Sequence, residues 1–143
     1  MNIDAVCDRI RQDYATFPAE QSYDLYAEDV YFRDPMNEFT GVEQYREMIG
    51  FIARWFQEPQ LELHRLDQTS PQTFETHWTL SWMTPLPWRP QITIPGWTEY
   101  RLNDDGQIVS HIDSWHCSRW AVLGQVFGLN QSSGADPTTG SGA

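Results

Sequence analysis

The sequence predicts an α+β fold in which a curved antiparallel sheet wraps around N-terminal helices and forms a cone that is open at one end. Apolar residues recur every three or four positions through much of the first 56 residues, which is typical of amphipathic helices. After Pro59 the apolar period falls to two, which indicates successive strands. The length of 143 residues and the hydrophobic content of 40% fit one globular domain.

Two helices are expected at the start of the chain. The first covers residues 3–16 and ends before Pro18, because apolar side chains follow helical spacing at Ile3, Val6, Ile10 and Tyr14. The second is a short helix over residues 23–28, for which Ser22 can provide the N-terminal cap.

A short strand and a third helix follow. Residues 30–35 predict a strand that Pro35 stops, and residues 36–41 are expected to form a turn-rich loop. Residues 42–56 carry one apolar stripe at helical spacing, which predicts the third helix.

Four strands are expected next, over residues 61–68, 73–83, 92–102 and 108–117. Alternation in the second of them places one set of side chains on a single face: Phe74, Thr76, Trp78, Leu80 and Trp82. Residues 84–90 form a stiff, Pro-rich link, and residues 103–106 end in Asp-Gly, which suits a hairpin turn. The four strands are therefore expected to form an antiparallel meander.

The end of the chain changes in composition. We assign the domain to residues 1–117 and treat residues 118–130 as a C-terminal extension that can form a helix, although Gly124 and Gly128 weaken that prediction. Residues 131–143 are poor in apolar residues and rich in Gly, Ser and Thr, so a disordered tail is expected there.

The net charge of −11 argues against two classes of partner. Phosphate backbones and anionic membrane faces repel so acidic a chain, and no basic run offsets this, so neither nucleic acid nor a membrane is expected as a partner. The sequence has no apolar stretch long enough to span a membrane, and the charges in its first residues lead us to expect no signal peptide. Cys7 and Cys117 stand far apart and are expected to be free thiols, which indicates a cytoplasmic protein.

Metal and cofactor motifs are missing from the sequence. The four histidines follow no HxH or HxxxH spacing, and the chain has no P-loop, GxGxxG or GxSxG motif. We therefore expect no metal and no cofactor, although local motifs do not reveal a metal site assembled from several strands.

Two segments of the chain resemble a known superfamily. Residues 23–49 read YDLYAEDVYFRDPMNEFTGVEQYREMI, and residues 98–116 read TEYRLNDDGQIVSHIDSWH. In this order they resemble the nuclear transport factor 2-like superfamily, which includes ketosteroid isomerase and polyketide cyclase-like domains. The resemblance covers residues 3–117. More narrowly, the chain resembles an uncharacterised domain family of cyanobacteria and plastids, which implies a cytoplasmic or stromal protein and supplies no reaction.

The resemblance implies that Asp34 faces the pocket, because the isomerase carries its proton-shuttling base immediately before the Pro of this strand. A carboxylate in an aromatic cavity loses hydration, which raises its pKa and suits a base near neutral pH. In the alternative, Asp34 is a turn residue whose oxygens accept hydrogen bonds from backbone N–H groups of the next loop. Tyr14 resembles one oxyanion donor of the isomerase, but the favoured interpretation is an aromatic core residue in the apolar stripe of the first helix. Thr98 stands where the second donor, a protonated Asp, is found, and this departure argues against steroid-type isomerisation.

The last strand supplies the other two catalytic candidates. Alternation places Val109, His111, Asp113 and Trp115 on one face, and the resemblance implies that this face looks into the pocket. His111 and Asp113 are two residues apart, so they can act as an acid–base pair or can satisfy each other as buried polar groups.

The expected pocket is aromatic and largely apolar. The candidate ligand-binding residues are Tyr14, Phe32, Trp78, Trp82, Thr98, Tyr100 and Trp115. Trp88 can cap the mouth of the cone. Trp97 falls on the outer face of the sheet, and because this superfamily often forms dimers through that face, a homodimer is expected.

Three functions remain open on the sequence alone. The favoured one is a small-molecule-binding domain for an apolar or amphipathic ligand, because the second oxyanion donor is missing. The first alternative is an acid–base enzyme of the isomerase, dehydratase or cyclase type that uses Asp34 and the His111–Asp113 pair. The second is a dimeric scaffold or interaction module, because fold alone does not decide function.

Overall fold

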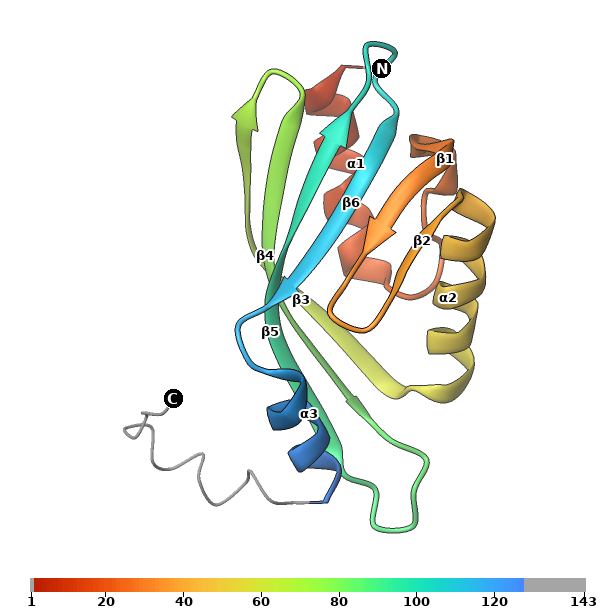
Figure 1. Ribbon diagram of the computed structural model, residues 1–143, viewed down its shortest axis with the longest axis vertical. Coiled ribbons are helices and arrows are strands. Elements are labelled where there is room, and N and C mark those ends of the chain that lie inside the picture. Colours follow the sequence, from red (N-terminus) through yellow and green to blue (C-terminus); the bar gives the residue numbers. More distant parts are fainter. Residues whose placement is uncertain (1, 128–143) are drawn as a thin grey trace.

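The computed structural model describes residues 2–127, and it has the α+β architecture that the sequence predicted. A curved, open sheet packs against helices on its concave side (Figure 1). The elements in chain order are α1 (Ile3–Thr16), a 3₁₀ turn (Tyr23–Leu25), β1 (Tyr26–Arg33), β2 (Glu38–Thr40), α2 (Val42–Trp55), β3 (Gln57–Ser70), β4 (Thr73–Met83), β5 (Gln91–Leu102), β6 (Ile108–Trp115) and α3 (Arg119–Val126). The tail expected over residues 131–143 lies outside the described residues.

A side-chain cap sets the start of helix α1, and the residue before a proline sets its end. The Asn2 side chain accepts a hydrogen bond from the backbone N–H of Ala5 at 2.9 Å, which caps the first turn. The helix buries Val6 and Ile10 against the sheet, and the extended backbone of Phe17 before Pro18 stops it.

The second helix predicted over residues 23–28 is wrong. Only Tyr23–Leu25 form a single 3₁₀ turn, and the chain then extends directly into β1. A strand forms here in place of the predicted helix because Tyr26 and residues 31–33 pair with β6. This partner lies more than 75 residues away in the sequence, so it leaves no local signal. Residues 38–40, expected in a loop, form β2 and pair with β1 in antiparallel orientation.

The antiparallel meander of β3, β4, β5 and β6 is confirmed. The strand order is β2-β1-β6-β5-β4-β3, and β1 runs parallel to β6. The sheet is therefore mixed, which the sequence did not predict. Strand β3 starts at Gln57, four residues earlier than expected, because residues 57–60 continue the pairing with the end of β4.

Alternate side chains along β4 and β5 point into the core, as expected. Phe74 and Thr76 are buried on β4, and their cross-strand partners Tyr100 and Thr98 are buried on β5. A bulge in the β5–β6 pairing shifts the register after Arg101 and places Ile108 in the core. Val109, expected on the inner face, is therefore displaced and lies half-buried outside the cavity lining.

Helix α3 is fixed on the sheet by polar bonds. The Ser118 hydroxyl caps it by accepting from the backbone N–H of Ala121 at 3.0 Å. The Gln125 side chain accepts from the backbone N–H of Thr93 at 2.7 Å and donates to the Thr93 carbonyl at 2.9 Å. Among residues 2–127, no helix is long and apolar enough to cross a membrane.

Candidate functional site

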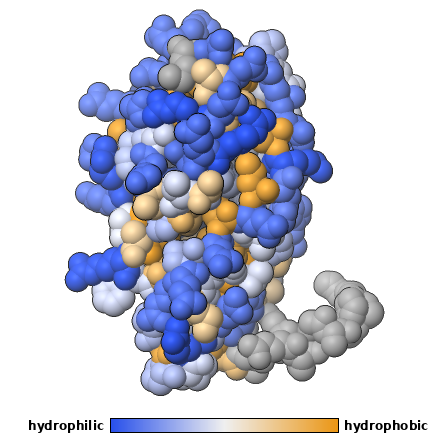
Figure 2. Space-filling model, turned by 180° about the vertical axis from the view of Figure 1, so that it is seen from behind, coloured by the Kyte–Doolittle hydropathy of each residue, from blue (hydrophilic) through white to orange (hydrophobic). Residues whose placement is uncertain are grey.

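A cavity of about 700 Å³ lies between the concave face of the sheet and the three helices. Seen from behind the view of Figure 1, the surface is largely hydrophilic, with apolar side chains exposed in its middle (Figure 2). The ten residues that the sequence assigned to the pocket line this cavity: Tyr14, Phe32, Asp34, Trp78, Trp82, Thr98, Tyr100, His111, Asp113 and Trp115. Their roles in binding or catalysis stay predictions.

Asp113 is the best-positioned carboxylate in the cavity. Its Oδ1 accepts from the Thr98 hydroxyl at 2.5 Å and pairs with His111 Nε2 at 2.9 Å. No residue within 2–127 donates a hydrogen bond to Oδ2. The carboxylate is therefore held by one oxygen, which leaves the second for a bound molecule.

His111 is packed more tightly than Asp113, because rings surround it. Its side chain is 6% exposed against 19% for that of Asp113. Ring centroids of Phe32, Tyr45 and Tyr100 lie 4.9, 5.4 and 4.8 Å from the imidazole. Both ring nitrogens have a partner within the protein, since Nε2 lies 2.9 Å from Asp113 Oδ1 and Nδ1 lies 3.3 Å from the Tyr26 hydroxyl. His111 therefore orients Asp113 and has no ring nitrogen left for a ligand.

Thr98 uses its hydroxyl fully within the protein. Its Oγ accepts from Trp78 Nε1 at 2.8 Å and donates its only proton to Asp113. The hydroxyl therefore has no proton left to stabilise an oxyanion in a ligand. This bonding supports the argument against steroid-type isomerisation.

A second polar cluster surrounds Tyr14. Its hydroxyl lies 2.7 Å from Thr76 Oγ and 3.0 Å from the Tyr100 hydroxyl. Burial, with the charge of Asp113, raises the pKa of Tyr14 to about 12. Burial also raises the pKa values of Tyr45 and Tyr100, so these phenols stay neutral donors at physiological pH. Tyr14 is a core residue of the cavity wall whose hydroxyl already has two partners.

Asp34 combines both interpretations that the sequence left open. It lies in the loop just after β1 and lines the cavity. Its Oδ1 also accepts from the backbone N–H groups of Met36 at 2.7 Å and Asn37 at 2.6 Å, which ends the strand in a tight turn. Burial raises the pKa of Asp34, while the bonds from Met36 and Asn37 oppose the rise and the charge of Asp113 adds to it.

Several cavity residues were missed by the sequence reasoning. Tyr26 was expected in a helix, and α3 was left ambiguous, although Trp120, Val122 and Leu123 all line the cavity. The apolar stripe of α2 was recognised but was not assigned to the pocket, although it supplies Met48, Ile49 and Ile52; Phe51, which lies outside that stripe, also lines the cavity. A helical stripe does not reveal whether it faces packed core or open space, so sequence gave no signal for this distinction.

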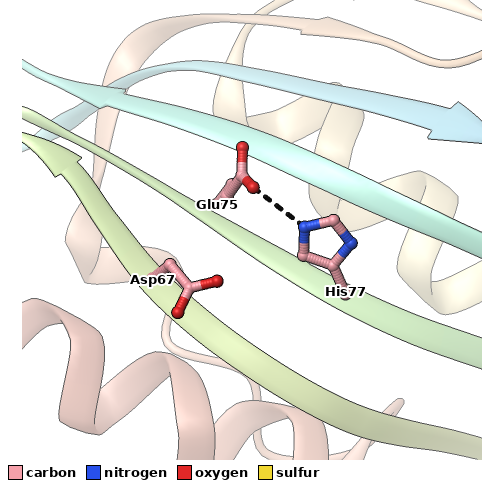
Figure 3. Close-up of side chains that lie close together, drawn as sticks. All are labelled: Asp67, Glu75 and His77. Atoms are coloured by element: carbon pink, nitrogen blue, oxygen red, sulfur yellow. Dashed lines mark hydrogen bonds and ion pairs between the residues drawn. The ribbon is translucent and has the colours of Figure 1, made fainter.

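Three side chains outside the cavity could hold a metal ion. Asp67, Glu75 and His77 bring one ligand atom each to within 4.8 Å of one another (Figure 3). They come from two strands, which explains why no local motif marked them. Arg65 already occupies the cluster, since its Nε donates to Asp67 at 2.7 Å and its NH2 group lies 3.2 Å from His77 Nε2. The guanidinium charge opposes a bound cation, so we assign no metal here.

Comparison with known proteins identifies a family and a fold for this chain. A family model described as an uncharacterized conserved protein (DUF2358) matches residues 4–111. A comparison with curated protein sequences gives no match. Among solved structures, an NTF2-like protein of unknown function from Exiguobacterium is 17% identical, with a TM-score of 0.65 over 78% of this chain and 98% of that one.

Two further solved structures resemble the fold. A hypothetical protein with a ketosteroid isomerase-like fold from Catenulispora acidiphila, in complex with trimethylamine, is 16% identical, with a TM-score of 0.67 over 87% of this chain and 93% of that one. SalBIII, an epoxide hydrolase/cyclase-like enzyme of salinomycin pyran ring formation, is 17% identical, with a TM-score of 0.61 over 78% of this chain and 88% of that one. At these identities the likeness establishes the fold, and it confirms the predicted nuclear transport factor 2-like architecture.

Proposed function

The chain belongs to the uncharacterised conserved family DUF2358, and from the geometry of its cavity we propose that it is a small-molecule-binding domain. The observation that carries this proposal is a cavity of about 700 Å³ whose walls are mainly aromatic and aliphatic. This volume falls within the usual range of ligand pockets, and a few polar groups that converge on an apolar cavity suit a small organic molecule. The ligand class is apolar or amphipathic.

The polar groups suggest how such a ligand is oriented. Asp113 can accept a hydrogen bond through Oδ2, and Asp34 presents a second carboxyl group to the same space. A ligand with an apolar body and a hydroxyl, amide or amine donor therefore fits the cavity better than a carboxylate does, because the two acidic side chains repel an anion.

Native mass spectrometry of the protein purified from its own source tests this proposal. We expect a species heavier than the chain by the mass of one small organic molecule, lost when the protein is denatured. A native mass equal to the chain mass under conditions that retain weak ligands would contradict it.

A second candidate function is acid–base catalysis on the bound molecule, of the isomerase, dehydratase or cyclase type. The observation that favours it is the fixed Asp113 carboxylate, which His111 and Thr98 orient through one oxygen. In this scheme Asp113 is the base, His111 positions it, and Asp34 is a second proton carrier. Asp113→Asn should then abolish turnover of the co-purified molecule and retain its binding.

We also propose that the protein forms a homodimer and is cytoplasmic. We place the homodimer contact on the outer sheet face around Trp97, whose ring packs on His116 with centroids 4.6 Å apart. The free thiols of Cys7 and Cys117 support a cytoplasmic protein. Neither a metal nor a cofactor is part of the proposed function.

A further inference from the structure

Large apolar side chains that are exposed on this protein gather at one end of the cone. We name three segments the apolar rim: residues 51–56 at the end of α2, residues 84–90 in the link before β5, and residues 119–127 around α3. Figure 1 places these segments together at the lower end of the molecule. They supply six of the seven large hydrophobic side chains described as exposed: Phe51, Trp55, Trp88, Trp120, Leu123 and Phe127.

The rim surrounds the mouth of the cavity. Phe51, Trp120 and Leu123 are exposed and also line the cavity, so they mark its opening. Trp88 belongs to the same surface, because its Nε1 donates to the carbonyl of Val126 in α3 at 2.7 Å. The exposed fractions reach 77% for Trp120 and 58% for Trp88, and exposed apolar side chains grouped in this way mark an interaction surface.

The charge of the rim is opposite to that of the rest of the chain. The three segments contain three of the nine basic residues and none of the 20 acidic ones, in a protein of net charge −11. Each basic residue is an arginine next to an exposed tryptophan: Arg54 beside Trp55, Arg89 beside Trp88 and Arg119 beside Trp120. None of these three arginines forms an ion pair within residues 2–127. Arg119 donates a hydrogen bond to the Pro35 carbonyl at 3.4 Å, and the Arg54 guanidinium lies 5.4 Å from the centroid of the Trp55 ring, so no acidic side chain within this range neutralises their charges.

We propose that the apolar rim docks on the surface of an anionic lipid bilayer, so that the cavity mouth opens toward the membrane. Tryptophan concentrates at the depth of lipid headgroups, and arginine pairs with phosphate while its stem stays in apolar surroundings. Three separate segments around an opening match a plane better than they match a peptide helix, which needs a groove. This docking goes beyond ligand binding, but it supplies a route by which a poorly soluble ligand enters the cavity.

The net negative charge of the whole chain predicted no membrane partner, but the rim itself carries a net positive charge. Charges separated by more than about 10 Å are largely screened at physiological ionic strength. The local charge of the docking face, and not the net charge of the chain, therefore determines whether that face is attracted to an anionic bilayer. The remaining acidic surface then favours an orientation in which the rim faces the bilayer and the acidic body faces away from it.

Flotation with lipid vesicles tests the proposal. Wild-type protein should float with phosphatidylcholine vesicles that contain phosphatidylglycerol, less with phosphatidylcholine alone, and less as salt is raised. Each arginine near an anionic surface contributes roughly fivefold to partitioning, so the triple variant Arg54→Gln, Arg89→Gln, Arg119→Gln should lose about a hundredfold. Arg101→Gln, an exposed arginine outside the rim and without an ion pair among the described residues, is the matched control and should float like the wild type.

A double variant separates the apolar contribution. Trp88→Ser with Trp120→Ser should lose binding to both kinds of vesicle, while circular dichroism shows an intact fold.

No flotation of the wild type at low ionic strength would overturn the proposal, as would equal flotation of the triple variant. Capture of a protein by the wild type but not by the rim variants, without any vesicle binding, would assign the surface to a protein partner instead. Variants that narrow the cavity should still float, so a failure of ligand binding is distinguishable from a failure of docking.

Discussion

Replacing Thr98 by valine should destabilise the protein far more than the same change at Thr76. Thr98 is 1% exposed, and its hydroxyl links the indole N–H of Trp78 to the carboxylate of Asp113. Valine has the same shape and removes both bonds. An unsatisfied buried N–H costs about 1–3 kcal/mol and a lost bond to a charged group about 1.5–3 kcal/mol, so after the gain from an added methyl we expect a net loss of about 2–4 kcal/mol.

Thr76 provides the matched control, because it is the cross-strand partner of Thr98 and is equally buried. Among residues 2–127 its hydroxyl bonds only to Tyr14, which keeps Tyr100 as a second partner at 3.0 Å. Thr76→Val should therefore cost about 1 kcal/mol or less. Thr98→Ser keeps the hydroxyl and should lose only about 1 kcal/mol for the missing methyl.

Urea denaturation followed by tryptophan fluorescence measures these three changes as differences in the free energy of unfolding. The order of cost should be Thr98→Val well above Thr76→Val and Thr98→Ser. If Thr98→Val costs no more than Thr76→Val, the proposed Trp78–Thr98–Asp113 network does not stabilise the cavity wall, and the reasoning is refuted.

Three further predictions concern the turn, the sheet and the assembly. Burial raises the pKa of Asp34, so its stabilising contribution is complete below its unfolded value of about 3.9 and is lost as pH rises through the folded value. The stability of Asp34→Asn relative to wild type should therefore rise between about pH 4 and about pH 8 in urea denaturation, and a fall would show that the turn bonds dominate. Gly96→Ala should lose about 2–4 kcal/mol by the same measurement, since its Cβ would lie 2.5 Å from the Ser114 carbonyl oxygen and 2.7 Å from the Trp78 ring; a cost below about 0.5 kcal/mol would contradict this. Light scattering should find a dimeric wild type and a monomeric Trp97→Glu variant, and a monomeric wild type at high micromolar concentration would end the dimer proposal.

The strands of the meander could be predicted because their signal is local. A period of two fixes which side chains share a face, so Trp78, Trp82, Thr98 and Tyr100 could be assigned to the cavity side before the structure was known. The same rule failed for Val109, because one extra residue in a bulge shifts the register and alternation carries no trace of it.

Features that depend on distant partners could not be read from the sequence. Tyr26 starts a strand only because β6 lies beside it, and the parallel direction of that pair follows from the whole chain path. The partners of Asp113 could be anticipated for His111, two residues away on one strand, but not for Thr98, whose hydroxyl arrives from β5. The candidate site was therefore predictable as a set of residues but not as a hydrogen-bonded network.

The central claim is that the cavity binds a small apolar or amphipathic molecule, and titration with the neutral dye Nile red tests it most directly. Leu61→Trp with Leu80→Trp narrows the cavity from two paired strands, while Leu63→Trp with Leu66→Trp adds the same bulk beside the core outside the cavity lining. We predict saturable binding with one dye per chain in the wild type and in the control pair, and loss of binding in the cavity pair. Absence of saturable binding in the wild type, or equal binding by both pairs, would contradict the claim.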